Sequence, residues 1–181
     1  DIAVLQYTGG TTGVPKGAML THANLIANVT QSRMIFPGAE VGRERMLGVL
    51  PFFHVFAMTG AMNLGLACGA ELLLMPRFTI DDLFALIKRK RPTYLPGVPT
   101  LYTAIYNHPK AQSVDLSSIR ICVSGGASLP LEVKAKFEAA TGCKLMEGYG
   151  LSETAPVLTI NPLDAARTGS AGLPVPGTVI E

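Results

Sequence analysis

YTGGTTGVPKG, residues 7–17, combines several glycines with threonine hydroxyls and one lysine. Because a glycine has no Cβ, successive backbone N–H groups in such a segment can turn toward the same anion. The lysine adds a positive charge, and the hydroxyls add further hydrogen-bond donors. The segment therefore predicts a loop that holds the phosphates of a nucleotide. The residues expected to form this loop are Thr8, Gly9, Gly10, Thr11, Thr12, Gly13 and Lys16.

This loop differs from the common nucleotide-binding sequence G-x-x-x-x-G-K-[ST]. Pro15 precedes the lysine and Gly17 follows it, so no serine or threonine hydroxyl stands beside Lys16 to bind magnesium. Taken alone, the segment is also compatible with a glycine-rich turn after a strand. The choice between a phosphate loop and a simple turn depends on the rest of the sequence.

The composition indicates one folded domain. The chain has 181 residues, of which 48% are hydrophobic, enough for a substantial core. A net charge of +2, with one basic cluster at the end of an expected helix, argues against a nucleic-acid partner. The cysteines are odd in number and lack C-x-x-C spacing, so we expect reduced thiols inside the fold and a cytoplasmic location. They are Cys68, Cys122 and Cys143.

The run Val55–Met75 raises the question of a membrane span. Its only charged residue is Glu71, and it is long enough to cross a bilayer. Glycines at positions 60, 65 and 69 divide the run into a helix-like part and the strand-like ELLLM. We therefore predict that this run is buried in the domain.

Short apolar runs alternate with amphipathic stretches along the chain, which is typical of an α/β fold with a mostly parallel sheet flanked by helices. The expected buried strands are Ile2–Tyr7, Met46–Leu50, Glu71–Met75, Thr93–Leu95, Ile119–Ser124 and Lys144–Glu147. Capping residues predict helices that begin near Thr21 and near Thr79, and a third between Pro130 and Gly142.

The segment EGYGLSETA, residues 147–155, follows one of these strands. It therefore lies at the carboxyl edge of the sheet, where open α/β folds bind ligands. Tyr149 offers an aromatic face for a base, and Glu153 a hard oxygen ligand for magnesium. Alternatively, Tyr149 is an aromatic residue at the rim of the core, and Glu153 the acidic first turn of a helix. The residues expected to contact nucleotide are Gly148, Tyr149, Gly150 and Thr154.

SGGAS, residues 124–128, also follows a strand, and its glycines leave a flat backbone surface against which a ring could lie. The residues expected to contact the ring are Gly125, Gly126 and Ala127. In PFFHVFA, residues 51–57, His54 stands among three phenylalanines. A single histidine there is more often packed and hydrogen-bonded than catalytic, so we do not assign a general base. The three histidines lack zinc-site spacing.

These segments, in this order, resemble the motifs of the adenylate-forming (AMP-binding) superfamily, which includes acyl-CoA synthetases, peptide-synthetase adenylation domains and firefly luciferases. GSAGLPVPG, residues 169–177, resembles a fifth motif of that superfamily. Within the superfamily, the sequence is most similar to that of bacterial long-chain fatty-acid–CoA ligases, in Gln6–His22, Glu147–Pro156 and Asn161–Asp164. Residues 50–62 contain no acidic side chain to pair with an amino acid's ammonium group. Members of the superfamily that act on short acids have a tryptophan that shortens the acyl pocket, and this chain contains none. A ligase for aromatic acids is the alternative.

The resemblance implies a two-step reaction. A fatty acid's carboxylate attacks the α-phosphorus of ATP, giving acyl-adenylate and pyrophosphate, and the thiol of coenzyme A then displaces AMP. It implies Lys16, His54 and Glu153 as catalytic residues, with Glu153 on Mg²⁺ and His54 orienting the carboxylate or gating the pocket. It also implies that Gly125, Gly126 and Tyr149 enclose adenine, while the phosphate loop and Thr154 contact the phosphates.

The resemblance further implies that residues 1–181 are the central portion of the large adenylation domain. We expect the segment before Asp1 and a C-terminal lid domain to be absent, and the chain alone to be inactive. A nucleotide-binding fragment without catalysis is the alternative. Peripheral association with the inner face of the membrane and a homodimer are both compatible with these expectations.

Overall fold

The computed structural model describes residues 1–8, 15–36, 39–163, 165–167 and 169–181. Its main sheet is formed by β3 (Arg45–Gly48), β4 (Glu71–Leu74), β5 (Tyr94–Gly97), β6 (Ile121–Ser124), β7 (Leu145–Gly150), β8 (Val157–Ile160) and β9 (Leu173–Pro174). Their order is β4-β3-β5-β6-β7-β8-β9. Neighbours from β4 to β7 are parallel, whereas β7–β8 and β8–β9 are antiparallel. The expected mostly parallel sheet is confirmed, and five expected strands overlap β3 to β7; β8 and β9 were not expected.

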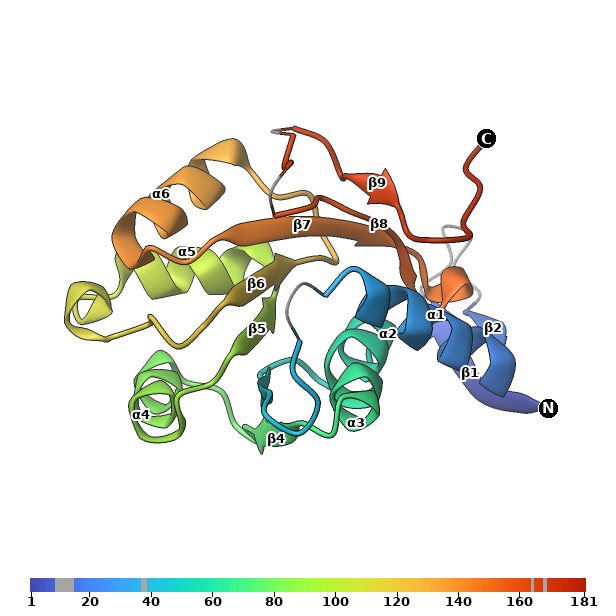
Figure 1. Ribbon diagram of the computed structural model, residues 1–181, viewed down its shortest axis with the longest axis horizontal. Helices are drawn as coiled ribbons and strands as arrows, with labels where there is room; N and C mark the ends of the chain where they lie inside the picture. The colour runs from blue at the N-terminus through green and yellow to red at the C-terminus, as the bar shows by residue number, and fades with distance from the viewer. Residues whose placement is uncertain (9–14, 37–38, 164, 168) are drawn as a thin grey trace.

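Helices cover both faces of this sheet (Figure 1). They are α1 (His22–Met34), α2 (Val55–Ala57), η1 (Met58–Asn63), α3 (Leu64–Ala67), α4 (Ile80–Lys90), α5 (Pro99–Asn107), η2 (Ala111–Ser113), α6 (Leu131–Thr141) and η3 (Ser152–Thr154). Successive residues of a strand point to opposite faces. Leu95 and Cys122 accordingly pack with α4, α5 and α6, while Tyr94 and Ile121 pack on the opposite side with Phe36 and α3. The central strands are therefore apolar on both faces.

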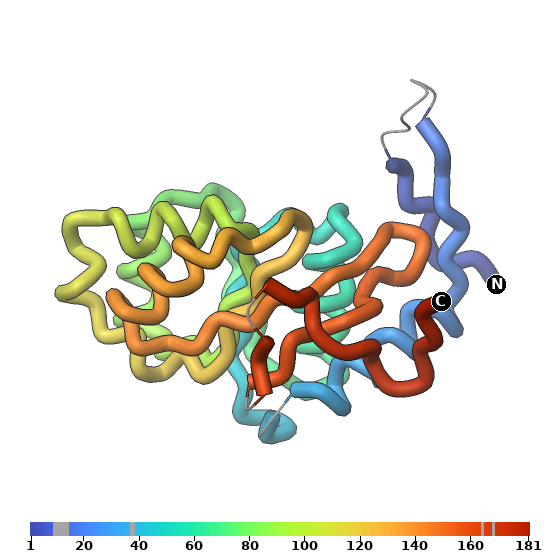
Figure 2. Tube along the Cα trace, turned by 90° about the horizontal axis from the view of Figure 1, so that it is seen from above, coloured from blue at the N-terminus to red at the C-terminus, as the bar shows by residue number. Residues whose placement is uncertain are grey.

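The expectation for Ile2–Tyr7 as a buried strand of the main sheet is wrong. β1 (Ile2–Thr8) pairs antiparallel with β2 (Lys16–Thr21) in a separate two-stranded sheet. This hairpin projects from the rest of the molecule (Figure 2), and the Ile2 and Leu5 side chains are exposed. The sequence indicates that the segment is extended, but it does not identify the partner strand. That partner is β2, which follows the predicted phosphate loop in the sequence.

The expected helix boundaries follow from local capping. The Thr21 hydroxyl accepts from the Asn24 N–H at 3.1 Å, and the Thr79 hydroxyl accepts from the Asp82 N–H at 3.0 Å. At the end of α6, Gly142 has φ 72°, in the left-handed region that glycine adopts readily. The two hydroxyls bond N–H groups that the first turn of a helix leaves free, and Gly142 ends α6. The three expected helices are confirmed.

The run Val55–Met75 forms α2, η1, α3 and β4. η1 is a stretch of π-helix between two short α-helices, a form that recurs at functional sites. Within the part of the chain that the structure describes, no helix is both long enough and apolar enough to cross a bilayer. The three cysteines are buried and free.

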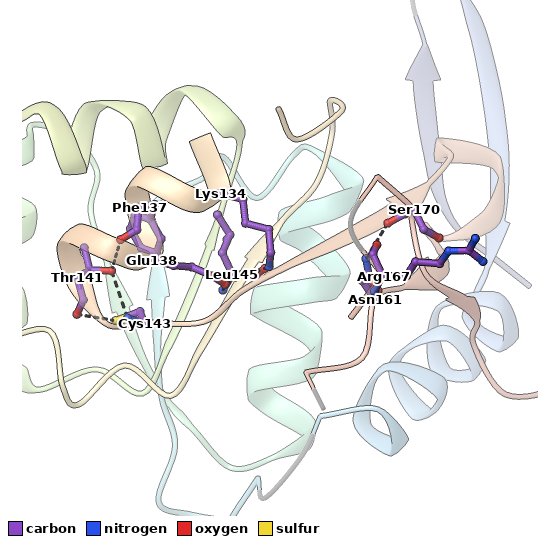
Figure 3. A network of polar contacts seen from close by, with 9 residues as sticks. All are labelled: Lys134, Phe137, Glu138, Thr141, Cys143, Leu145, Asn161, Arg167 and Ser170. Atoms are coloured by element: carbon purple, nitrogen blue, oxygen red, sulfur yellow. Dashed lines mark hydrogen bonds and ion pairs between the residues drawn. The ribbon is translucent and has the colours of Figure 1, made fainter. Parts of the chain in front are cut away.

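Polar side chains tie the last strands to their surroundings (Figure 3). Lys134 on α6 donates to the carbonyl of Leu145, and Glu138 accepts from the Leu145 N–H at 2.8 Å. Near the end of the chain, the amide of Asn161 donates to the carbonyls of Arg167 and Ser170 at 2.8 and 2.7 Å. These contacts fix the start of β7 and the turn that leads to β9.

Candidate active site

A pocket of about 400 Å³ opens at the carboxyl ends of β6 and β7, with Tyr94 at the start of β5 in its wall. The end of α1, the start of α2 and the end of β1 complete its wall. The pocket brings together eight residues that the sequence predicts as site residues. These are Thr8, His54, Gly125, Gly126, Gly148, Tyr149, Gly150 and Glu153. Three separate sequence motifs and one end of the predicted phosphate loop therefore meet at one opening.

The phosphate loop itself lies largely outside the described residues. This applies to Gly9, Gly10, Thr11, Thr12 and Gly13. The flanking residues belong to the hairpin: the Thr8 hydroxyl donates to the Lys16 carbonyl at 3.4 Å. Thr8 lines the pocket, whereas Lys16 is exposed at the first position of β2 and does not line it. The predicted contact between Lys16 and phosphate stays a prediction.

Glu153 is a free carboxylate at the mouth of the pocket. It lies in η3, is exposed, and has no hydrogen bond or ion pair with any residue that the structure describes. No group of three or more histidine, cysteine, aspartate or glutamate side chains within the described ranges could hold a metal. Magnesium is commonly held by one or two carboxylates together with substrate phosphates. Glu153 fits that arrangement, because its oxygens remain free for a shared ion.

The loop that carries Glu153 closes on itself. The Thr154 hydroxyl accepts from the Leu151 N–H at 3.1 Å and donates to the Pro156 carbonyl at 2.5 Å. The Leu151 N–H also donates to the Pro156 carbonyl at 3.1 Å. Thr154 does not line the pocket, and its hydroxyl serves the turn itself. Its expected contact with phosphate stays a prediction.

The glycines on either side of Tyr149 differ. A Cβ on Gly150 would lie 2.3 Å from the carbonyl oxygen of Pro156, closer than folded backbones allow. A Cβ on Gly148 would meet its nearest atom, the Thr159 carbonyl oxygen, at 3.5 Å, an ordinary contact. Gly150 is therefore needed by the loop's own backbone. Gly148 and the half-exposed Tyr149 ring face the pocket without that constraint.

The two glycines after β6 also have separate roles. A Cβ on Gly125 would lie 3.3 Å from the Phe56 ring, which fills the space that a side chain would occupy. Gly126 has φ 78°, which favours glycine. Both line the pocket, whereas Ala127 is exposed and does not. The flat surface expected at this loop is thus partly covered by Phe56.

His54 is the N-cap of α2, and it is exposed at the pocket. Its Nδ1 accepts from the Phe56 N–H at 3.2 Å. A neutral imidazole whose Nδ1 accepts carries its proton on Nε2. This cap orients the ring and leaves one donor for a ligand. We expected a histidine in this segment to be packed and hydrogen-bonded. His54 is hydrogen-bonded, but it is exposed and not packed in the core.

The inner end of the pocket contains residues that the sequence did not identify. Tyr94 and Phe36 meet edge to face, with ring centroids 5.1 Å apart. Burial raises the pKa of the Tyr94 hydroxyl well above its usual value, so the ring is neutral. Ser32 is buried on α1, and its hydroxyl has no partner among the described residues. The strand assignment of residues 93–95 was the only signal for Tyr94, while nothing in the sequence pointed to Ser32.

The whole chain, residues 1–181, matches the family of AMP-binding enzymes. It is 49% identical to a long-chain-fatty-acid–CoA ligase of Bacillus subtilis, over 98% of this chain and 32% of the relative. It is 42% identical to 4-coumarate–CoA ligase 1 of Arabidopsis thaliana, over 89% of this chain and 29% of the relative.

Solved structures agree with these relatives. The fold is similar to that of apo MatB from Rhodopseudomonas palustris, with a TM-score of 0.89 and 32% identity over 98% of this chain and 34% of that one. It is also similar to the anthranilate CoA ligase AuaEII in complex with anthranoyl-AMP, with a TM-score of 0.89 and 28% identity over the same shares. The chain thus spans about a third of the length of its relatives. On the evidence of its motifs, its fold and these matches, it belongs to the AMP-binding enzyme family.

Proposed function

We propose that this chain is part of an AMP-forming acid–CoA ligase that converts a fatty acid into its CoA thioester. The observation that carries the proposal is the meeting of His54, Tyr149 and Glu153 at one pocket, in a chain whose relatives are named as CoA ligases. In the first half-reaction, the carboxylate attacks the α-phosphorus of ATP and pyrophosphate leaves. In the second, the thiol of coenzyme A attacks the acyl carbon and AMP leaves.

The residues of the pocket have complementary tasks in the first half-reaction. Nε2–H of His54 is available to a carboxylate oxygen, which would orient the acid for attack. The exposed ring of Tyr149 and the backbone of Gly126 offer surfaces to adenine. Such chemistry depends on holding charged oxygens in position more than on a protein nucleophile. No covalent intermediate with the protein is needed.

Glu153 is proposed to hold Mg²⁺ together with the phosphates of ATP. The ion would neutralise charge that develops on the phosphate oxygens. The support is the free carboxylate at the pocket mouth. The phosphate loop, with Lys16, is proposed to hold the β- and γ-phosphates.

A long-chain fatty acid is the proposed substrate. The support is an apolar inner wall made of Phe56, Leu64, Val123, Met146 and Ile160, together with relatives named as long-chain-fatty-acid–CoA ligases. Each buried methylene contributes about 0.8 kcal/mol, so such a wall favours long chains over acetate.

An aromatic acid is the second candidate substrate. The edge-to-face pair of Phe36 and Tyr94 offers a ring-lined end to the pocket, and a plant relative is named as a 4-coumarate ligase. Bulky aromatic walls suit a planar ring as well as a chain.

ATP–pyrophosphate exchange on the full-length protein distinguishes these candidates. Palmitate, octanoate, 4-coumarate, benzoate, acetate and an amino acid are compared in one series. Highest kcat/KM with palmitate or octanoate supports the fatty-acid proposal, and preference for 4-coumarate or benzoate supports the second candidate. Preference for acetate or the amino acid contradicts both.

Two further proposals concern the location of the protein and the activity of residues 1–181 alone. We place the protein in the cytoplasm, with peripheral contact to the inner membrane face as a further proposal. Residues 1–181 alone are proposed to bind nucleotide weakly and to form no acyl-adenylate. Cell fractionation and acyl-AMP assays on this segment test the two statements.

A further inference from the structure

The turn after Glu153 is hydrogen-bonded to Thr59, a buried residue that has no part in the function proposed above. Ala155 ends η3 with φ 70°, a left-handed conformation that is rare for residues other than glycine. It is almost fully buried. Its carbonyl accepts a hydrogen bond from the Thr59 hydroxyl at 2.7 Å, and Thr59 is also buried, in η1.

The side chain of Ala155 is the meeting point of three elements. It packs with Leu20 on β2 and Val55 on α2 in a small cluster of buried residues, which we call the junction cluster. β2 follows the phosphate loop, Val55 follows His54, and Ala155 lies two residues after Glu153. The junction cluster is separate from the two larger clusters on the faces of the main sheet. Residues that follow each of the three proposed ligand-binding segments are therefore packed together at this point.

The hydrogen bond from Thr59 and the junction cluster both hold Ala155, two residues after Glu153. A residue in a sparsely populated backbone region keeps that conformation only when its surroundings impose it. Hydrogen bonds of Thr154 to Leu151 and Pro156 hold the η3 loop together next to Ala155. Thr59 holds Ala155 from the helical segment that begins beside His54.

We propose that Thr59 is a positioning residue that sets the place of Glu153 relative to His54 through the carbonyl of Ala155. The assignment rests on the proposed function, because its effect is exerted on the adenylation step. Thr59 is buried and does not line the pocket, so it acts on the site only through its neighbours. Its loss is therefore expected to lower kcat and to leave the KM values for acid and ATP nearly unchanged.

The test uses the full-length protein and pyrophosphate exchange. Thr59→Val keeps the shape of the side chain and removes the donor, and Thr59→Ser keeps the donor. We expect kcat to fall about tenfold in Thr59→Val, with KM changes below about threefold, and to return to within about threefold of wild type in Thr59→Ser. A residue with only a structural role would lower thermal stability without this pattern.

A double-mutant cycle with Glu153→Gln tests whether Thr59 acts through Glu153. If it does, Thr59→Val lowers kcat by less than about twofold in the Glu153→Gln background. A full tenfold loss in that background would overturn the assignment. So would an unchanged kcat in Thr59→Val, or an equal loss in Thr59→Ser.

The experiment also covers a variant that does not fold and a wild-type protein that is inactive. If Thr59→Val does not fold, Thr59→Cys replaces it, because a thiol of similar size is a much weaker donor. If the wild-type protein exchanges pyrophosphate with none of the acids, the proposed function fails and the assignment fails with it. An active wild type beside an unaffected Thr59→Val rejects the assignment alone.

Discussion

On one side of β5, β6 and β7, the protein packs large side chains against α4, α5 and α6; on the other side of the same strands it leaves a pocket of about 400 Å³. The first side contains Phe137 and Tyr102, both fully buried and in edge-to-face contact. The pocket side contains glycine backbone, a free carboxylate and a hydroxyl without a partner in the described part of the chain. The packed side therefore consists of core residues, whereas the pocket side combines core residues such as Tyr94 and Met146 with groups that stay free for a ligand.

The largest effect is expected on the packed side. Phe137→Ala removes a fully buried ring that meets Tyr102 with centroids 4.9 Å apart. The free energy of unfolding should fall by about 3–5 kcal/mol, because the ring's contacts are lost and a cavity remains. Urea unfolding measures the change, with exposed Leu131→Ala on the same helix as control. The comparison fails if Phe137→Ala, while still folded at low temperature, loses activity as strongly as a pocket variant.

Glu153→Gln is the matching change on the pocket side. It keeps the size of the side chain and removes the charge proposed to hold Mg²⁺. Pyrophosphate exchange should fall by roughly 10²–10³-fold, equivalent to about 3–4 kcal/mol of transition-state stabilisation. The unfolding midpoint should not change, since Glu153 has no partner among the residues that the structure describes.

Glu132→Gln on α6 is the control for that substitution. Glu132 is also exposed, pairs with Lys136 at 2.6 Å and does not line the pocket. It should leave exchange unchanged. Near-normal exchange in Glu153→Gln would reject the metal assignment.

The two glycines beside Tyr149 sharpen the comparison within the pocket itself. Gly150→Ala should lower the free energy of unfolding by about 1–3 kcal/mol, because the new Cβ meets the Pro156 backbone. Gly148→Ala should leave stability near wild type, since its Cβ has room. Thermal unfolding and ATP affinity are measured for both. Equal stability of the two variants would show that the close approach at Gly150 does not constrain the loop.

The smallest effect concerns pH and lies at the rim of the packed side. Hydrogen bonds from Ser117, together with the Arg91 guanidinium, lower the pKa of Asp115 from 3.8 to about 2. A carboxyl whose pKa is lowered by folding stabilises the folded state above pH 3.8, and this contribution is lost as the pH falls through about 2. The melting temperature of Asp115→Asn should therefore depend less on pH in that window. Identical slopes for variant and wild type would contradict this, and exchange at neutral pH should be unaffected.

Much of the main sheet is predictable from the sequence, because its strands are apolar on both faces and lie between helices with recognisable caps. The error at Ile2–Tyr7 has a physical cause: an apolar, β-prone segment is extended whether it joins a parallel sheet or a hairpin, and only its pairing partner decides. β8 and β9 were missed because they follow β7 as antiparallel strands without an α-helix between them, outside the alternating pattern from which the strands were predicted.

The candidate site was predictable as a set of segments, and less so as individual contacts. Glycines signal a need for space, but the sequence does not say whether a ligand or the protein fills it; at Gly125 the Phe56 ring does, and at Gly150 the Pro156 backbone. Ser32 and Thr59 carry no sequence signal, because their positions depend on contacts between distant parts of the chain.

The contacts of α6 with Leu145 have a consequence for how the protein behaves among other molecules. β8 covers β7 only from Gly148 onward, so the beginning of β7 would otherwise present a free N–H and carbonyl. Glu138 and Lys134 occupy these two groups, as described above. An open strand edge is a template on which a second polypeptide can add. Because side chains of the same domain already take both backbone groups of Leu145, neither group is open to strand pairing with a second polypeptide.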